Sequence, residues 1–244
     1  MRATELIGRR RFFGRVFAAG LALITGLWPR ALRAASGNFW DGDDYVGKTR
    51  GGVFERFYIQ YYRSFRRVRA ADWRLRVGGR CAEPQELTLA QLRALPPKTQ
   101  RSRLKCVECW SATADWSGFA FAEIERLARP APEAVGAVFR CADTYVEYLS
   151  LADLRHDRTL LVLSMDGMPL SDEHGFPLRL IVPFKYGYKS AKAILEIEFV
   201  DRPHNGTWSQ IGPYSLDGTI LPGYDHPLDR GGARRRISGG EVRD

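Results

Sequence analysis

Hydrophobic and polar residues alternate in several short segments of the chain, and a period of two is typical of half-buried β-strands. The first such segment is Trp73–Val77, which ends at the turn residues Gly78-Gly79. Further strands are predicted over 137–141, 145–150, 159–165, 178–182 and 195–200, with a turn at 166–167. The pattern therefore predicts a strand-rich body.

Two short helices interrupt these strands. Thr88 and Gln91 have the spacing of a capping box in front of an apolar stripe, and Pro96 and Pro97 end that helix. A second helix is predicted over about 119–127. Short helices on a strand-rich body predict a single α+β domain over 54–202, with an irregular lead-in over 37–53 and an irregular C-terminal extension over 203–244.

The N-terminus has the composition of an export signal. Arg9, Arg10 and Arg11 precede an apolar run over 16–28, and small residues follow at 34–37. The run is shorter than the roughly 20 residues that a membrane-spanning helix needs. Residues 1–36 are therefore predicted to be a twin-arginine signal that is removed on export to the periplasm; an uncleaved membrane anchor is the alternative.

The charge of the chain changes once this segment is set aside. The whole chain carries a formal net charge of +9, but seven arginines and one glutamate lie in residues 1–36, so the remainder is close to neutral. Nucleic acid binding requires a basic stripe in the folded protein, and we predict none. The basic clusters over 63–69 and 234–236 are interpreted as solvated faces, with an anionic partner as the alternative.

The cysteines offer three kinds of chemistry. Cys106 and Cys109 stand three positions apart, whereas Cys81 and Cys141 are isolated. A zinc site would require two such pairs or paired histidines, which this sequence lacks. A thiol-disulfide couple would require a setting that lowers a thiol pKa, and Glu108 between the two sulfurs opposes that. A disulfide between Cys81 and Cys141 is allowed by export and cannot be deduced from sequence.

Two longer segments carry a specific resemblance. KCVECWSATADWSGFAFAEI over 105–124 and HGFPLRLIVPFKYGYKSAKAI over 174–194 resemble the molybdopterin oxidoreductase family that includes the sulfite oxidases and the exported protein-methionine-sulfoxide reductase catalytic subunits. The resemblance covers about 57–201. It implies a sulfite-oxidase-type fold, molybdenum with molybdopterin as cofactor, and Cys106 as the protein ligand to the metal. A soft thiolate suits such a metal.

The same resemblance implies the residues that hold the cofactor. A glycine between lysines lets backbone N–H groups approach a phosphate, and arginine recognises anions bidentately. The implied pterin and phosphate contacts are His174, Arg179, Lys185, Lys189, Ser190, Ala191 and Lys192. Weaker candidates at positions that depart from the family pattern are Gln60, Arg63, Ser64 and Cys141, the last with core packing as its alternative.

Glu108, Trp110 and Trp116 lie beside the implied metal ligand. Glu108 is a candidate proton carrier, with a salt bridge as the alternative, and the two tryptophans either wall the pocket or pack in the core. Cys109 is interpreted as a small buried residue.

The resemblance implies a monomeric oxidoreductase that reduces S-oxides, such as protein methionine sulfoxide, and takes electrons from a haem partner. The sulfite oxidases of the family carry a C-terminal dimerisation domain, and none is expected after residue 201. Sulfite oxidation with a c-type cytochrome is the alternative within the family. A cofactor-free thiol-disulfide or binding module is the alternative outside it.

Overall fold

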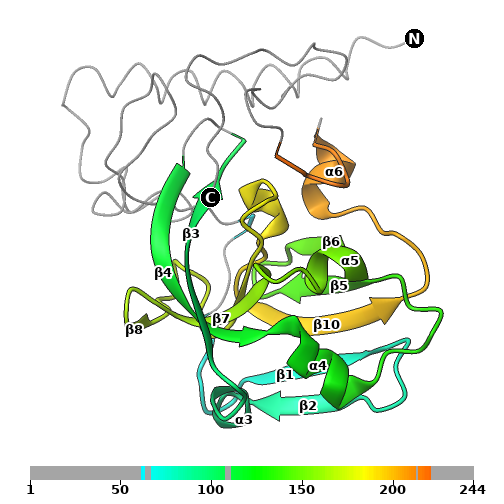
Figure 1. Cartoon of the computed structure of the whole chain (residues 1–244), viewed down its shortest axis with the longest axis horizontal. Coiled ribbons are helices and arrows are strands. Elements are labelled where there is room, and N and C mark those ends of the chain that lie inside the picture. The colour runs from blue at the N-terminus through cyan, green and yellow to red at the C-terminus, as the bar shows by residue number, and fades with distance from the viewer. Residues whose placement is uncertain (1–61, 64–66, 108–110, 213, 221–244) are drawn as a thin grey trace. The chain divides into compact units, whose positions relative to one another are not determined.

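The structure, a computed structural model, describes residues 62–63, 67–107, 111–212 and 214–220. Its first sheet has five strands in the order β2-β1-β10-β5-β6 (Figure 1). These strands are β1 Arg74–Gly79, β2 Gln85–Thr88, β5 Gly136–Cys141, β6 Val146–Ser150 and β10 Ile194–Val200. All neighbours are antiparallel except β1 and β10, which run parallel. The sheet thus joins strands from both ends of the described domain.

The second sheet brings the cysteine segment over 105–124 together with the segment over 174–194. Its order is β3-β4-β7-β8, and β9 also pairs with β7. The strands are β3 Lys98–Lys105, β4 Ser111–Ala120, β7 Leu160–Met165, β8 Met168–Pro169 and β9 Arg179–Ile181. Because β7 pairs with β4 and with β9, the cysteine segment and the 174–194 segment lie in one sheet.

The helices within the described residues are short. They are α3 Leu89–Arg93, α4 Phe121–Ala128, α5 Leu151–Leu154, the 3-10 turn η1 Gly187–Lys189, and α6 Thr207–Ile211. α4 contacts β1 and β4, and α5 contacts β5 and β6 (Figure 1). None of the helices in this part of the chain is long and apolar enough to cross a bilayer.

The main core lies where strands of both sheets contribute apolar side chains. Phe121 of α4 packs against Phe139 of β5 and Phe199 of β10, with ring centroids 6.3 and 6.0 Å apart. Leu161 of β7 joins this cluster, while its neighbours Leu160 and Val162 face a second cluster around Trp116. Both faces of β7 are therefore buried. This burial fixes the strand with which β4 and β9 pair.

The structure confirms the strand-rich α+β fold predicted from the alternating pattern. β1, β5, β6, β7, β9 and β10 fall on the predicted strands. The second helix starts two residues later than predicted, at Phe121, because Phe119 and Ala120 pair with β7 as the end of β4. β2, β3, β4 and β8 were not predicted. The C-terminal segment predicted to be irregular contains α6.

The capping box at the start of α3 is present as predicted. Gln91 N–H donates to Thr88 Oγ1 over 3.2 Å, and Thr88 N–H donates to Gln91 Oε1 over 2.9 Å.

Thr88→Ala should lower the free energy of unfolding by about 1 kcal/mol, because one orphan N–H of the helix then has no side-chain partner. Urea denaturation measures this. Thr88→Ser keeps the hydroxyl and should behave as wild type; equal losses for both variants would contradict the capping role.

Candidate cofactor site

Cys106 stands at the end of a long hairpin where its two strands are connected. β3 and β4 pair without interruption from Lys98↔Gly118 to Lys105↔Ser111, and the cysteine follows β3 directly. Its side chain is partly buried and packs against the cluster formed by Leu104, Trp116 and their neighbours. The hairpin therefore holds the Cys106 side chain next to this cluster.

Arg179 approaches the same cluster from β9. The side chain is 2% exposed, and its guanidinium carbon lies 4.9 Å from the centre of the Trp116 ring. Nη1 donates to the backbone carbonyl of His174 over 3.1 Å, but Nε is buried without a hydrogen-bond partner among the described residues. Burial lowers the pKa of Arg179 from 12.5 to about 9. A cation–π contact compensates only part of such a loss of hydration.

Trp116 packs in the core, which is one of the two alternatives predicted for it. It is fully buried, and its indole N–H donates to the carbonyl of Ser102 over 3.1 Å. The ring is a core residue and also the surface on which Arg179 rests.

His174 and Lys192 complete a cluster of basic side chains around Arg179. Burial, and then the charges of Arg179 and Lys192, lower the pKa of His174 to about 4, so the imidazole is neutral at pH 7. Burial, followed by Arg179, lowers the pKa of Lys192 to about 7. Its ammonium donates to the carbonyl of Glu173 over 3.1 Å. Each shift shows that positive charge is held close together with limited hydration.

The turn that carries Lys192 is fixed by its own hydrogen bonds. Ser190 Oγ accepts from Val182 N–H over 3.1 Å, and the carbonyl of Ala191 accepts from Leu180 N–H over 2.8 Å. Both residues are buried. Cys141 lies next to this turn, because its sulfur hydrogen-bonds with the backbone of Lys192. Burial, reinforced by the Asp143 carboxylate, raises the pKa of the Cys141 thiol well above its usual value.

Lys185 and Lys189 were both predicted to face a phosphate. In the structure, both ammonium groups contact internal acceptors instead. Lys189 Nζ contacts Glu147 Oε1 at 2.6 Å, and Lys185 Nζ contacts Asp217 Oδ1 at 2.8 Å. A buried ammonium requires such partners, and the sequence gives no sign of them because Glu147 sits in an ordinary alternating strand.

The remaining predicted residues are exposed or lie outside the described residues. Arg63 is exposed, and its guanidinium lies 5.5 Å from the ring centre of its neighbour Tyr62. Gln60, Ser64, Glu108, Cys109 and Trp110 are not among the described residues. The cysteines Cys81 and Cys141, which could have formed a disulfide, are both free.

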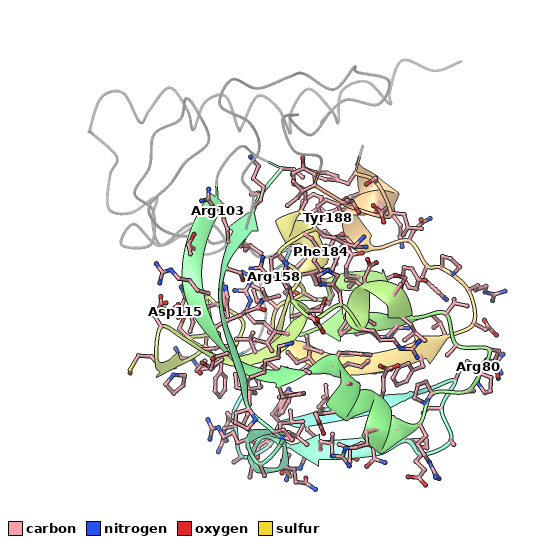
Figure 2. The ribbon with its side chains drawn as sticks, viewed as in Figure 1. Arg80, Arg103, Asp115, Arg158, Phe184 and Tyr188 are labelled. Carbon is pink, nitrogen blue, oxygen red and sulfur yellow. The ribbon has the colours of Figure 1, made fainter. Side chains whose placement is uncertain are left out.

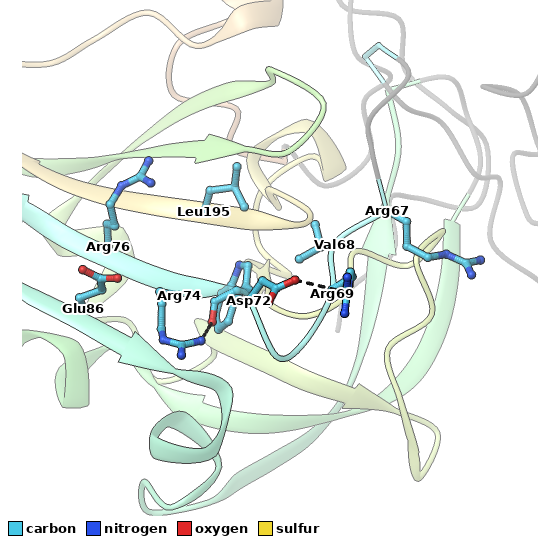
Figure 3. A pocket seen from close by; sticks show the side chains of 9 residues that line it. Arg67, Val68, Arg69, Asp72, Arg74, Arg76, Glu86 and Leu195 are labelled. Atoms are coloured by element: carbon cyan, nitrogen blue, oxygen red, sulfur yellow. Dashed lines mark hydrogen bonds and ion pairs between the residues drawn. The ribbon is translucent and has the colours of Figure 1, made fainter.

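Residues 67–69 of the basic 63–69 segment border a hollow of about 390 Å³ (Figure 3). Arg67 pairs with Asp172 and Arg69 with Asp72, while Arg76, also in the lining, pairs with Glu196. Arg74 donates to two backbone carbonyls. These contacts favour the interpretation of this surface as a solvated face.

Comparison with known proteins identifies the family. The model of the oxidoreductase molybdopterin binding domain matches residues 62–208. The chain belongs to this family. The matched residues 62–208 include β1 to β10, Cys106 and the cluster around Arg179.

Two curated relatives share a third or more of their aligned residues with this chain. The protein-methionine-sulfoxide reductase catalytic subunit MsrP of Xanthomonas axonopodis is 33% identical over 190 residues, which cover 70% of this chain and 59% of the relative. The putative protein-methionine-sulfoxide reductase subunit YedZ1 of Azospira oryzae is 39% identical over 147 residues, covering 60% and 56%. The chain thus spans less than two thirds of the length of these relatives.

A solved structure supports the fold. The sulfane dehydrogenase SoxCD of Paracoccus pantotrophus aligns with a TM-score of 0.59 and 15% identity, over 77% of this chain and 56% of that chain. At this identity the likeness concerns the fold alone.

The cluster fits an anionic pterin cofactor. Arg179 Nε is a buried donor that has no acceptor within the described residues, and the nearby turn presents backbone groups and Lys192. A terminal phosphate would supply acceptors and negative charge to these groups. Among the described residues no three His, Cys, Asp or Glu side chains gather in a possible metal site, and a metal carried mainly by an organic cofactor requires no such group.

Arg179→Met should leave the cofactor-free chain equally stable or stabilise it by about 1–3 kcal/mol, because a buried cation without a carboxylate partner costs more than a methionine of similar volume. Chemical denaturation of protein made without molybdenum cofactor measures this. Arg140→Met, which removes an arginine paired on the surface with Glu198, is the control. A loss above about 1 kcal/mol in Arg179→Met would show that Arg179 serves the fold.

In the cofactor-free chain the ring of His174 should titrate near pH 4, because burial and neighbouring cations disfavour its charged form. The folded pKa lies below the unfolded value of 6.5. This residue's contribution to stability is therefore present above pH 6.5 and lost as pH falls toward 4. NMR titration gives the pKa, and His174→Asn should flatten the stability profile between these values. A midpoint above about 6 would contradict the assignment.

Proposed function

We propose that this chain is an exported, monomeric molybdenum–molybdopterin oxidoreductase that reduces S-oxides, with protein methionine sulfoxide as the substrate class. The observation that carries the proposal is the buried Arg179 beside the Cys106 hairpin, whose Nε has no acceptor among the described residues, in a chain of the molybdopterin-binding family. The names of the two curated relatives support the substrate class. The paired arginines before Val16 support export to the periplasm by the twin-arginine route.

The residues present divide the work of holding the cofactor. Arg179, Lys192 and the 190–192 backbone would bind its anionic end, and His174 would offer a neutral imidazole for a hydrogen bond to the heterocycle. Cys106 would supply the thiolate ligand. When bound, the molybdenum cofactor supplies the two-electron oxygen-atom transfer that side chains cannot perform.

Reduction of a sulfoxide to a thioether and water consumes two electrons and two protons. The chain's own acids near Cys106 would deliver the protons, with Glu108 as the candidate. The electrons would come from a haem partner. Sulfite oxidation with a c-type cytochrome runs the electron flow in the opposite direction and is the second candidate within the family.

The experiment compares wild type, Cys106→Ser and Cys109→Ser purified after export. Wild type should contain stoichiometric molybdenum and reduce methionine sulfoxide with a reduced viologen dye. Cys106→Ser should lose activity by about a thousandfold or more, because the metal loses its protein ligand. Cys109→Ser should stay within about threefold of wild type.

Three results would contradict the proposal. Folded wild-type protein without molybdenum would exclude the cofactor. Equal loss of activity in the two serine variants would favour a thiol-disulfide couple. Faster oxidation of sulfite than reduction of methionine sulfoxide, on the same loaded sample, would favour the second candidate.

A further inference from the structure

Residues 215–220 lie along the loop that leads into the cofactor-binding turn, and we refer to them as the strap. Tyr186 N–H donates to the carbonyl of Gly218 over 2.8 Å, and Ile220 N–H donates to the carbonyl of Phe184 over 3.1 Å. Lys185 and Thr219 form an antiparallel bridge. The strap is thus paired through its backbone with residues 184–186.

The ammonium groups of two buried lysines contact the strap. Lys185, 2% exposed, donates to the carbonyl of Asp217 over 2.9 Å and to its carboxylate over 2.8 Å, and a second carboxylate, Asp153, lies 3.1 Å away. Lys189, 1% exposed, donates to the carbonyl of Leu216 over 2.8 Å. The Lys185 contact lowers the pKa of Asp217 to about 2, although burial alone would raise it.

Lys189 also ties the strap to β6. Its ammonium contacts Glu147, which is fully buried, and the carbonyl of Tyr148 over 2.5 Å. The hydroxyl of Tyr145 bonds the other oxygen of Glu147 over 2.9 Å and the carbonyl of Tyr188 over 2.6 Å. Lys189 is the last residue of η1, and Ser190 follows it. The network therefore fixes the start of the turn that carries Ser190, Ala191 and Lys192.

The outer edge of the strap has its own anchor. The hydroxyl of Tyr188 donates to the carbonyl of Ser215 over 2.7 Å, and Figure 2 shows Tyr188 near Phe184 in this region. Gly218 has φ +68°, and a Cβ there would lie 2.6 Å from Lys189 Cγ. Any side chain at this position would therefore push the strap away from Lys189.

We propose that the strap positions the cofactor-binding turn and slows release of the bound cofactor, with Lys185 and Lys189 as positioning residues. The proposal rests on the proposed function for the identity of what is bound. It also accounts for the two lysines of the second motif, whose ammonium groups the structure directs to carboxylates and carbonyls.

The test uses full-length exported protein as wild type, Gly218→Ala and Asp217→Asn. Gly218→Ala disrupts packing against Lys189, whereas Asp217→Asn removes a carboxylate that is 67% exposed and leaves the chain able to fold. Loaded protein is diluted and the rate of molybdenum loss is followed. Amide hydrogen exchange over 187–192 is measured on the same samples. Both variants should lose molybdenum about tenfold faster and exchange faster over 187–192, with turnover per bound molybdenum within about twofold of wild type.

Two controls separate positioning from general destabilisation. Thr88→Ala lowers global stability outside the strap, and Glu198→Gln removes a surface ion pair with Arg140; both should retain molybdenum as wild type does. Equally fast loss from Thr88→Ala would overturn the proposal, as would variants with unchanged exchange over 187–192. Wild type without molybdenum would contradict the proposed function, and the exchange data would still decide whether the strap positions the turn.

Discussion

The buried charge of Arg179 is the constraint on which the cofactor site depends. Its guanidinium rests on Trp116, yet Nε has no acceptor among the described residues. Folding alone gives no reason to bury a cation in this way, because a methionine would fill the space without the loss of hydration. A bound anion would give that reason, and the second sheet places Cys106 on the same apolar cluster.

The other buried cations of the second motif are satisfied differently. Lys185 contacts two carboxylates and one carbonyl of the protein, and Lys189 contacts one carboxylate and two carbonyls. This difference separates Lys185 and Lys189, whose charges contact carboxylates of the protein, from Arg179, whose Nε has no acceptor among the described residues. Basic side chains that lie only a few positions apart in sequence thus have two distinct roles. Only their three-dimensional contacts distinguish these roles.

The sequence predicts the strands whose apolar residues alternate, as in β1 and β10. It also predicts the helix that begins with the capping box of Thr88 and Gln91. It does not predict β3, because KTQRSRLK has few apolar residues and is a strand through its pairing with β4. The resemblance to the family proposed Arg179 and Lys192 as candidate cofactor contacts. It could not identify Glu147 or Asp217, since their roles arise from contacts with lysines 42 and 32 positions away.

The most direct test of this account is ³¹P NMR of the purified, exported protein. If Arg179 and Lys192 hold the phosphate end of a cofactor, one protein-bound resonance should persist after dialysis. Its chemical shift should stay constant between about pH 5 and 8, because nearby cations keep the phosphate fully ionised below its usual second pKa of about 6. Absence of bound phosphorus, or a resonance that titrates near pH 6, would contradict the central claim that this buried charge is built for an anion.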